Sequence, residues 1–461
     1  MNPFRGSRAL HDRLEKASPW AVVLFASSTS FAVYFCMYAF RKPFTVATYA
    51  GLSFGETGIE LKTALVLGQL LGYALSKYIG IKFCSQLKRE NLLMATIGLI
   101  FLAQAALLGF ALLPGGWKVA AIFANGLPLG MVWGLAMRYL EGRRATEIMV
   151  ATLSCSYIFA TGAVKDIGQR ILEFGHVDQF WMPFWTGLVF LPPLVISAWL
   201  LDALPQPDLN DQRERSHRSA MTTHDQWAFL AHFSVGLILL SFIYVLLTAF
   251  RDFRDNYAAD ILHELGLADV PGIFTKVEVV SAVIIALTLA GLSFFRHNRH
   301  ALVATFAIML SGVVMLGGTT LLFQAELVSG LAWMIFVGLG AYLAYVPYTV
   351  LFDRIFAATR ASGTSVFAIY LIDSLGYTGS TAIQVYKDLW KAEQSRLLFF
   401  QNFSLALSMI GFVALLVSGW YFIREERLAR EASVDHAANS VVETSTESPA
   451  ALGNHAAADT T

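Results

Sequence analysis

The sequence predicts an all-α membrane protein whose twelve transmembrane helices form two six-helix bundles. The first observation is composition, because 56% of the 461 residues are hydrophobic and only 14% are charged, whereas soluble proteins carry about 25% charged residues. The second is that twelve apolar runs follow one another along the chain. The third is a polar segment, 205–227, which separates six runs from six. Since about 20 apolar residues span a bilayer as a helix, each run is long enough to cross it.

The chain begins with a polar, basic segment, 1–19, before the first run. We expect the N-terminal bundle over 20–204, the central loop over 205–227 and the C-terminal bundle over 228–423. The runs are 20–45, 62–83, 91–113, 118–138, 146–172, 182–204, 228–250, 271–295, 299–323, 329–351, 361–386 and 397–423. The first run is too long for a signal peptide and lacks a small-residue cleavage site, so we interpret it as a spanning helix. We expect the charged, Ala/Ser/Thr-rich segment 424–461 to be a disordered tail.

Lys and Arg concentrate in every second connection, starting with the N-terminal segment. Because positive residues stay on the cytoplasmic side of membrane proteins, both termini and the central loop are expected to be cytoplasmic. We therefore expect a multi-pass protein of a bacterial inner membrane, surrounded by lipid and monomeric.

Several function classes find no support in the sequence. Positive and negative charges balance and lie in loops, so we expect no nucleic-acid partner. Cys36, Cys84 and Cys155 have no metal-ligand spacing and predict neither a metal site nor a disulfide framework. The chain also lacks a Gly-x-Ser-x-Gly motif, a phosphate-cradling glycine loop and a His/Glu/Asp cluster with metal spacing. We therefore expect no enzyme, no catalytic residue and no cofactor.

Charged residues inside the apolar runs are candidate functional residues, because a charge at mid-bilayer costs roughly 2.5–3.5 kcal/mol on insertion scales. The second run holds Lys77, the fifth holds Lys165 and Asp166, and the eleventh holds Asp373. For Lys165 and Asp373 two interpretations stand: a buried ion pair between helices, or a role in substrate binding or proton coupling.

Other charges suggest local pairs. Asp166 and Arg170 are four residues apart and can neutralise each other on one helical face. Lys276 and Glu278 open the eighth run and are interpreted as a pair at the membrane edge.

Two arginines close equivalent helices of the two halves. Arg41 and Lys42 end the first run, and Arg251 ends the seventh. One interpretation is a membrane-edge anchor whose long side chain reaches the interface. The other is an anion site on the axis between the halves, because planar guanidinium groups bind phosphate and carboxylate bidentately.

The ground plan is that of major facilitator transporters, whose two halves are related by a pseudo-two-fold axis with the substrate site between them. Small residues four apart, such as Gly68 and Gly72 or Gly126 and Gly130, predict close helix packing in such a bundle. Gly312, Gly317, Gly318, Gly338 and Gly340 are interpreted in the same way.

Short motifs extend this resemblance to the organophosphate:phosphate antiporter family, which includes glycerol-3-phosphate and hexose-phosphate transporters. Tyr38-Ala39-Phe40-Arg41-Lys42 resembles the family's Tyr-x-x-Arg-Lys, and Tyr73-Ala74-Leu75-Ser76-Lys77-Tyr78 is similar to its Tyr-Gly-Phe-Ser-Lys-Phe. Gly130-Met131-Val132-Trp133 resembles its Gly-Met-Gly-Trp. Gly376-Tyr377-Thr378-Gly379-Ser380, preceded by Gly363-Thr364, is similar to its Gly-Thr … Gly-Tyr-x-Gly-Ser.

By this resemblance Arg41 is the phosphate-binding arginine of the first half, with Lys42 and Lys77 as neighbouring cations. Tyr38 is then a hydrogen-bond partner of the substrate. Arg251 is the arginine of the second half, with Arg254 as its rival.

The chain departs from the family at three places. Tyr157 stands where the family has a histidine in the fifth helix. The Gly-x-x-x-Asp-Arg signature between the second and third helices is replaced by Gly80-Ile81-Lys82-Phe83-Cys84-Ser85-Gln86. Lys165 and Asp373 are charges without a family counterpart. The chain thus resembles a divergent relative of the family.

The sequence favours a secondary transporter of a small organic anion, with a phosphorylated substrate as the expectation from the resemblance. Antiport with phosphate and proton-coupled symport both stay open, with protons as a candidate coupling ion because of Asp373. The alternative is a transport-fold receptor that binds the anion and signals without moving it, which the missing signature favours. The identity of the substrate and the direction of transport stay open.

Overall fold

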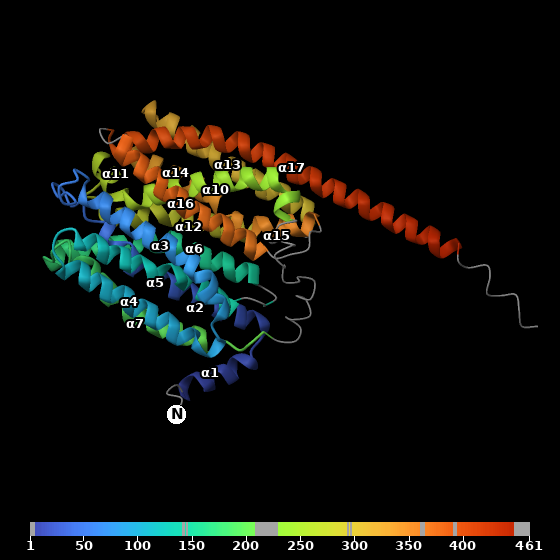
Figure 1. Cartoon of the computed structure of the whole chain (residues 1–461), viewed down its shortest axis with the longest axis horizontal. Helices are drawn as coiled ribbons and strands as arrows, with labels where there is room; N and C mark the ends of the chain where they lie inside the picture. The colour runs from blue at the N-terminus through green and yellow to red at the C-terminus, as the bar shows by residue number, and fades with distance from the viewer. Residues whose placement is uncertain are drawn as a thin grey trace, which may run out of the picture.

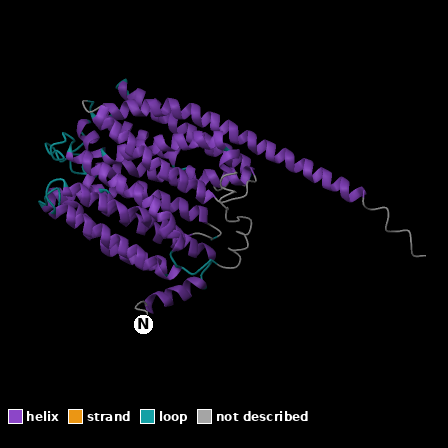
Figure 2. Ribbon diagram, in the orientation of Figure 1, coloured by secondary structure: helices purple, strands orange, loops and turns teal. Residues whose placement is uncertain are grey.

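The computed structural model describes residues 5–140, 143, 146–207, 229–292, 295, 297–359, 365–390 and 394–446. Nearly all of these residues are helical (Figure 2), and the described part has no strand beyond an isolated bridge between Ser53 and Glu60. Most of the central loop and the end of the tail, residues 208–228 and 447–461, lie outside the described residues.

The first bundle follows a short helix, α1 (Arg5–Glu15). Its six long helices are α2 (Pro19–Arg41), α3 (Leu61–Gln86), α4 (Leu92–Leu112), α5 (Trp117–Leu140), α6 (Thr146–Gly175) and α7 (Met182–Asp202). Local chemistry sets the ends of α2: the Ser18 hydroxyl accepts a hydrogen bond from the Ala21 amide at 3.3 Å, and Pro19 occupies the first turn. Lys42 caps the end of the helix, and Pro43 then opens a short 3₁₀ turn, Pro43–Thr45.

The second bundle repeats the pattern. Its helices are α10 (Ser234–Asn256), α12 (Ile273–Leu292), α13 (Asn298–Gln324), α14 (Gly330–Tyr345) with α15 (Tyr348–Thr359), α16 (Ser365–Trp390) and α17 (Arg396–Thr446), and the short α11 (Ala258–Glu264) follows α10. The run expected at 329–351 is therefore divided. Pro347 lacks an amide hydrogen and cannot continue the helix, so the chain breaks between α14 and α15.

Ten helical segments of the described chain are long and apolar enough to cross a membrane. The other two long helices, α3 and α16, hold the charges Lys77 and Asp373 and pack among the ten: α3 lies on α5 and α16 on α10. The described residues thus form an all-α membrane fold with six long helical segments in each bundle, ten of which qualify as candidate spans. We call the side at which α2 and α10 begin proximal and the side at which they end distal. In Figure 1 the proximal side, with α15, lies to the right and the distal side, with α11, to the left.

The tail differs from the expectation. Residues 424–461 were expected to be disordered, but α17 continues without interruption to Thr446 and projects from the bundles (Figure 1). The segment after Ile423 is rich in Ala, Glu and Arg, which are strong helix formers. Glu426 also lies 3.7 Å from Arg299 at the end of the bundle.

Helices cross most closely where glycines face each other. A Cβ atom added to Gly126 would lie 2.6 Å from the Gln69 carbonyl oxygen, and one added to Gly340 would lie 2.7 Å from the Gly312 carbonyl oxygen. The predicted close packing is therefore confirmed at the α3–α5 and α13–α14 crossings. Gly318 was interpreted in the same way, but a Cβ atom there would meet nothing within 4 Å.

We expect Gly126→Ala to lower the melting temperature of the detergent-solubilised protein, because the added methyl group forces α3 and α5 apart. Overpacking of this kind destabilises by about 1–3 kcal/mol. Gly98→Ala is the matched control, since a Cβ atom there meets nothing within 4 Å. Equal melting temperatures for the two variants would contradict the close crossing.

Candidate functional site

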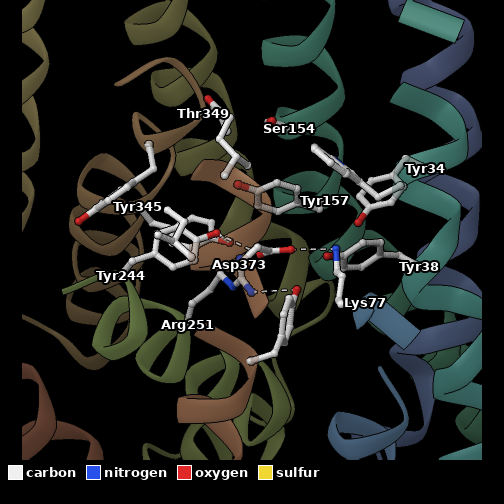
Figure 3. A pocket seen from close by; sticks show the side chains of 15 residues that line it. Tyr34, Tyr38, Lys77, Ser154, Tyr157, Tyr244, Arg251, Tyr345, Thr349 and Asp373 are labelled. Atoms are coloured by element: carbon white, nitrogen blue, oxygen red, sulfur yellow. Dashed lines mark hydrogen bonds and ion pairs between the residues drawn. The ribbon is translucent and has the colours of Figure 1, made fainter. Parts of the chain in front are cut away.

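The bundles enclose a central cavity to which eight helices contribute side chains. Its empty space is about 590 Å³, part of it open to solvent. The first bundle lines it from α2, α3, α5 and α6, and the second from α10, α14, α15 and α16 (Figure 3). The lining residues are Tyr34, Tyr38, Lys77, Trp133, Ser154, Tyr157, Tyr244, Arg251, Tyr345, Tyr348, Thr349, Ile369, Ile372, Asp373 and Tyr377.

Arg251 is the arginine of this lining. Its guanidinium group donates to Asp252 at 3.0 Å and to the Tyr377 hydroxyl at 3.4 Å, and it lies 4.3 Å from the centre of the Tyr345 ring. Asp252 is held in turn by the Ser380 hydroxyl at 2.9 Å. The group is thus oriented by a carboxylate on one side and by aromatic faces on the other, while its side chain keeps 12% exposure.

Arg41 is buried against an aromatic ring of the first bundle. Its guanidinium carbon is 3.8 Å from the centre of the Tyr73 ring, its Nε atom has no hydrogen-bond partner, and the residue is 2% exposed. Arg41 and Arg251 each lie 5.9 Å from the centre of the Tyr377 ring. The structure therefore brings both predicted arginines to one ring, but only Arg251 belongs to the cavity lining.

An ion pair crosses the cavity from bundle to bundle. Lys77 on α3 lies 2.9 Å from Asp373 on α16, and these side chains point toward each other in Figure 3. Asp373 also accepts a hydrogen bond from the Tyr244 hydroxyl at 3.1 Å, and Tyr244 contacts the Tyr345 hydroxyl at 2.8 Å. The pairing of Asp373 with Lys165, one of the two interpretations of the sequence, is therefore wrong. Each forms an ion pair with a different partner.

Lys165 belongs to a second group of charges, nearer the distal side. Its ammonium group and that of Lys42 both bind the carboxylate of Asp255, and Lys42 also donates to Asn256 at 2.9 Å. Lys42 and Lys165 come from the first bundle, whereas Asp255 and Asn256 end α10 in the second. Lys42, predicted to accompany Arg41 at the substrate, thus connects the bundles instead.

Further ion pairs continue this connection to the distal surface. Lys62 lies 2.5 Å from Asp260, and Arg396 lies 3.5 Å from the same carboxylate while it also binds Glu60. We call the residues of these contacts the distal seal. They are Lys42, Glu60, Lys62, Lys165, Asp255, Asn256, Asp260 and Arg396. The distal seal joins the two bundles beyond Arg251 through charge pairs.

Asp166 does not pair with Arg170 as expected. Its carboxylate accepts hydrogen bonds from the amides of Phe274 at 3.2 Å and Thr275 at 2.8 Å, at the start of α12 in the other bundle. A helix N-terminus favours a negative charge and offers unpaired amides, so Asp166 binds these amides instead of Arg170. The Arg170 side chain is exposed.

Arg254, the rival of Arg251, faces away from the central cavity. It donates to Glu278 at 2.6 Å and to the Met334 carbonyl at 3.1 Å. Glu278 was expected to pair with Lys276, but Lys276 is exposed and the buried carboxylate needs the buried cation.

Tyr38 and Tyr157 both line the cavity, as a substrate-binding role requires. The Tyr157 hydroxyl is buried without a hydrogen-bond partner, and the guanidinium carbon of Arg251 lies 5.9 Å from its ring centre. A donor left unpaired beside an arginine is suited to an oxygen atom of a ligand.

Sequence reasoning missed Asp255, Asp260, Lys62 and Arg396 as a connected set. Each lies at the end of a helix, where charges normally face water, so no local signal distinguishes them. Within the described residues, no group of three His, Cys, Asp or Glu side chains is placed to hold a metal ion. The three cysteines are free and buried.

Several solved transporter structures are similar in fold to this chain. A crystal structure of a D-xylose-proton symporter superposes with a TM-score of 0.60 and 16% identity, over 89% of this chain and 99% of that chain. A peptide transporter POT in complex with sulfate superposes with a TM-score of 0.58 and 13% identity, over 88% and 95%. The inward-open xylose transporter XylE from E. coli gives a TM-score of 0.52 and 14% identity, over 85% and 95%. At these identities the likeness shows the fold alone.

No curated protein matches the sequence. Residues 43–425 match the family described as "Family of unknown function (DUF5690)", a range that covers both bundles except α2. The chain therefore belongs to this family, and its fold is that of the major facilitator transporters.

Proposed function

We propose that this protein is a secondary transporter that moves a small organic anion by alternating access. The observation that carries the proposal is a central cavity lined by both bundles, with Arg251 in its wall and the distal seal beyond it. A symmetric pair of bundles can rock about such a cavity and expose it to either side. The transport functions named for the similar structures support this reading of the fold.

The distal seal suits a closure that must open again. Its ion pairs join the bundles, and water can replace each partner when the interface separates. An apolar interface of the same size would instead be exposed to water on opening. The seal thus closes one end of the pathway in this structure without making the closure permanent.

Arg251 is the proposed anion ligand, with Tyr38 and Tyr157 in the same lining and Arg41 behind the Tyr73 ring. The resemblance to organophosphate antiporters predicts a phosphorylated substrate bound by both arginines. Only Arg251 reaches the lining, so we propose an anion bound mainly by one guanidinium group. Lys77 would influence anion binding through its ion pair with Asp373.

Asp373 is the proposed coupling group. It is an acid of the central lining, paired with Lys77 across the bundles. Protonation would release Lys77 and add one positive charge to the cavity, which favours the anion. By linkage, the anion would then favour protonation, and this reciprocity is what proton symport needs.

We further propose that the proximal side is cytoplasmic, which puts both termini inside a bacterial inner membrane, and that the protein works as a monomer. The bias of Lys and Arg along the sequence supports this orientation.

Arg251→Gln is expected to weaken anion binding about 10- to 100-fold, because hydrogen bonds to charged groups contribute about 1.5–3 kcal/mol. Binding is measured by thermal shift with phosphate, glycerol 3-phosphate, succinate and benzoate, followed by uptake of the bound anion into proteoliposomes. Arg251→Lys should restore binding in part. Arg89→Gln is the control, since Arg89 pairs with Asp202 within the first bundle. Unchanged binding by Arg251→Gln would refute the site, and binding without uptake would favour a receptor.

Asp373→Asn is expected to abolish accumulation driven by an imposed proton gradient, because the variant lacks the carboxyl group that is proposed to carry the proton. Exchange of labelled for unlabelled anion should persist, since exchange moves no net proton. Both are measured in proteoliposomes, with Asp202→Asn as a control acid outside the cavity. Gradient-driven accumulation at the unaltered rate would rule out Asp373 as the coupling group.

Asp255→Asn is expected to loosen the distal seal, because breaking a buried ion pair costs about 3–5 kcal/mol and here leaves Lys42 and Lys165 without their carboxylate. To report on opening, Thr63, a buried distal residue of α3, is replaced by Cys in a protein without the native cysteines. A maleimide should label this introduced cysteine faster when Asp255→Asn is added. The labelling rate should stay unchanged when Asp202→Asn is added. Equal labelling rates in folded protein would show that Asp255 does not hold the interface closed.

A further inference from the structure

The lining of the central cavity is aromatic to an unusual degree. Eight of its fifteen residues are Tyr or Trp, whereas aromatic residues make up 13% of the chain. They come from both bundles, so a ligand between the bundles meets rings on each side. Aromatic side chains bind flat, apolar groups through their faces and edges.

The hydrogen-bonding groups of the cavity do not suit a molecule rich in hydroxyl groups. Among the described residues that line it there is no Asn or Gln side chain, and its one carboxylate, Asp373, is paired with Lys77. Several tyrosine hydroxyls are also occupied: Tyr348 donates to the Leu240 carbonyl and Tyr244 to Asp373. Sugars need donors and acceptors at each hydroxyl, because an unpaired buried polar group is unfavourable.

The charges around the cavity suit one negative charge. Lys77 pairs with Asp373 and Arg251 pairs with Asp252, so together with Arg41 behind the Tyr73 ring these five groups carry one net positive charge. Arg251 is the cation of the lining that a ligand can reach. Asp252 already takes part of the hydrogen-bonding capacity of Arg251. Arg41 lies behind the Tyr73 ring, outside the lining. A dianionic phosphate ester would therefore bring more negative charge than the accessible cation compensates.

Tyr157 completes the arrangement. Its buried hydroxyl has no partner, its ring lies beside the Arg251 guanidinium group, and it faces the cavity (Figure 3). From these observations we infer that the substrate is a monoanionic aromatic acid, with its carboxylate on Arg251 and the Tyr157 hydroxyl and its ring among the tyrosines and Trp133. This inference rests on the proposed function, since it assumes that the central cavity is the transport site.

The test compares the affinities of five ligands that differ in charge, in aromatic character or in their number of hydroxyl groups. Purified full-length protein in detergent is titrated by thermal shift with benzoate, cyclohexanecarboxylate, benzyl alcohol, glycerol 3-phosphate and D-xylose. We expect benzoate to bind at least about tenfold tighter than glycerol 3-phosphate and D-xylose, about tenfold being the effect of one uncompensated charge interaction. Cyclohexanecarboxylate should be weaker than benzoate because it lacks the flat ring, and benzyl alcohol should be weaker because it lacks the charge. Tighter binding of glycerol 3-phosphate or D-xylose, or no response to benzoate, would overturn the inference.

Variants of Tyr157 separate the ring from the hydroxyl. Tyr157→Phe should weaken benzoate binding by a few fold and Tyr157→Leu by roughly tenfold, because the second change also removes the aromatic face. Phe174→Leu is the matched control, since Phe174 is an exposed aromatic residue outside the cavity. Equal benzoate affinities of Tyr157→Leu and the control would remove Tyr157 from the site.

Variants of the ion pair test the charge argument. Asp373→Asn leaves Lys77 uncompensated, so the preference should shift toward glycerol 3-phosphate by roughly tenfold. The double variant Lys77→Gln with Asp373→Asn restores the net charge and should restore the preference for benzoate. A preference that is the same in all three proteins would contradict the charge argument.

Uptake into proteoliposomes distinguishes this inference from the proposed function. Benzoate that binds but is not transported would support the substrate class and refute transport. Transport of glycerol 3-phosphate without binding of benzoate would support transport and refute the substrate class.

Discussion

A cation buried between apolar helices must have a partner, and this requirement arranges the interior of the protein. Asp255 accepts Lys42 and Lys165, Asp373 accepts Lys77, and in each case the partners come from different bundles. Since desolvating a charge is more expensive than losing a surface ion pair, these contacts hold the bundles in register. The same contacts divide the interface into a closed distal end and a cavity. The closure and the site are therefore consequences of one electrostatic constraint.

Arg41 and Arg251 show two ways of holding a guanidinium group in such an interior. Arg251 has a carboxylate beside it and reaches the cavity. Arg41 lies against the face of the Tyr73 ring and keeps an unpaired Nε atom. Aromatic faces attract a cation without neutralising it, so the field of Arg41 still acts on the cavity through the rings. This asymmetry between the bundles is why we propose an anion site nearer to the second bundle, where Arg251 reaches the lining.

The likeness to solved transporters concerns the path of the backbone, and the wall of the cavity is this chain's own. Tyr38, Lys77 and Tyr157, which the resemblance made candidate substrate contacts, all line the cavity, and their part in binding stays a proposal. The motifs did not place Lys42, whose side chain leaves the cavity at the end of α2 and turns to α10. One residue of offset rotates a side chain by about 100° on a helix, which is enough to exchange a substrate contact for a bundle contact.

The sequence by itself determined the class of the protein, because twelve apolar runs and a polar centre depend only on composition and length. Local chemistry also explains the start of α2 at Ser18 and Pro19 and the break at Pro347, since caps and prolines act locally, although the apolar pattern predicts one unbroken run over 329–351. Only the tertiary structure decided which acid each cation meets. Lys165 and Asp373 are equally plausible partners by charge, but α6 faces α12 and the end of α10, while α16 faces α3. Ion pairs across an interface depend on distances between helices far apart in the chain, and no local pattern encodes those distances.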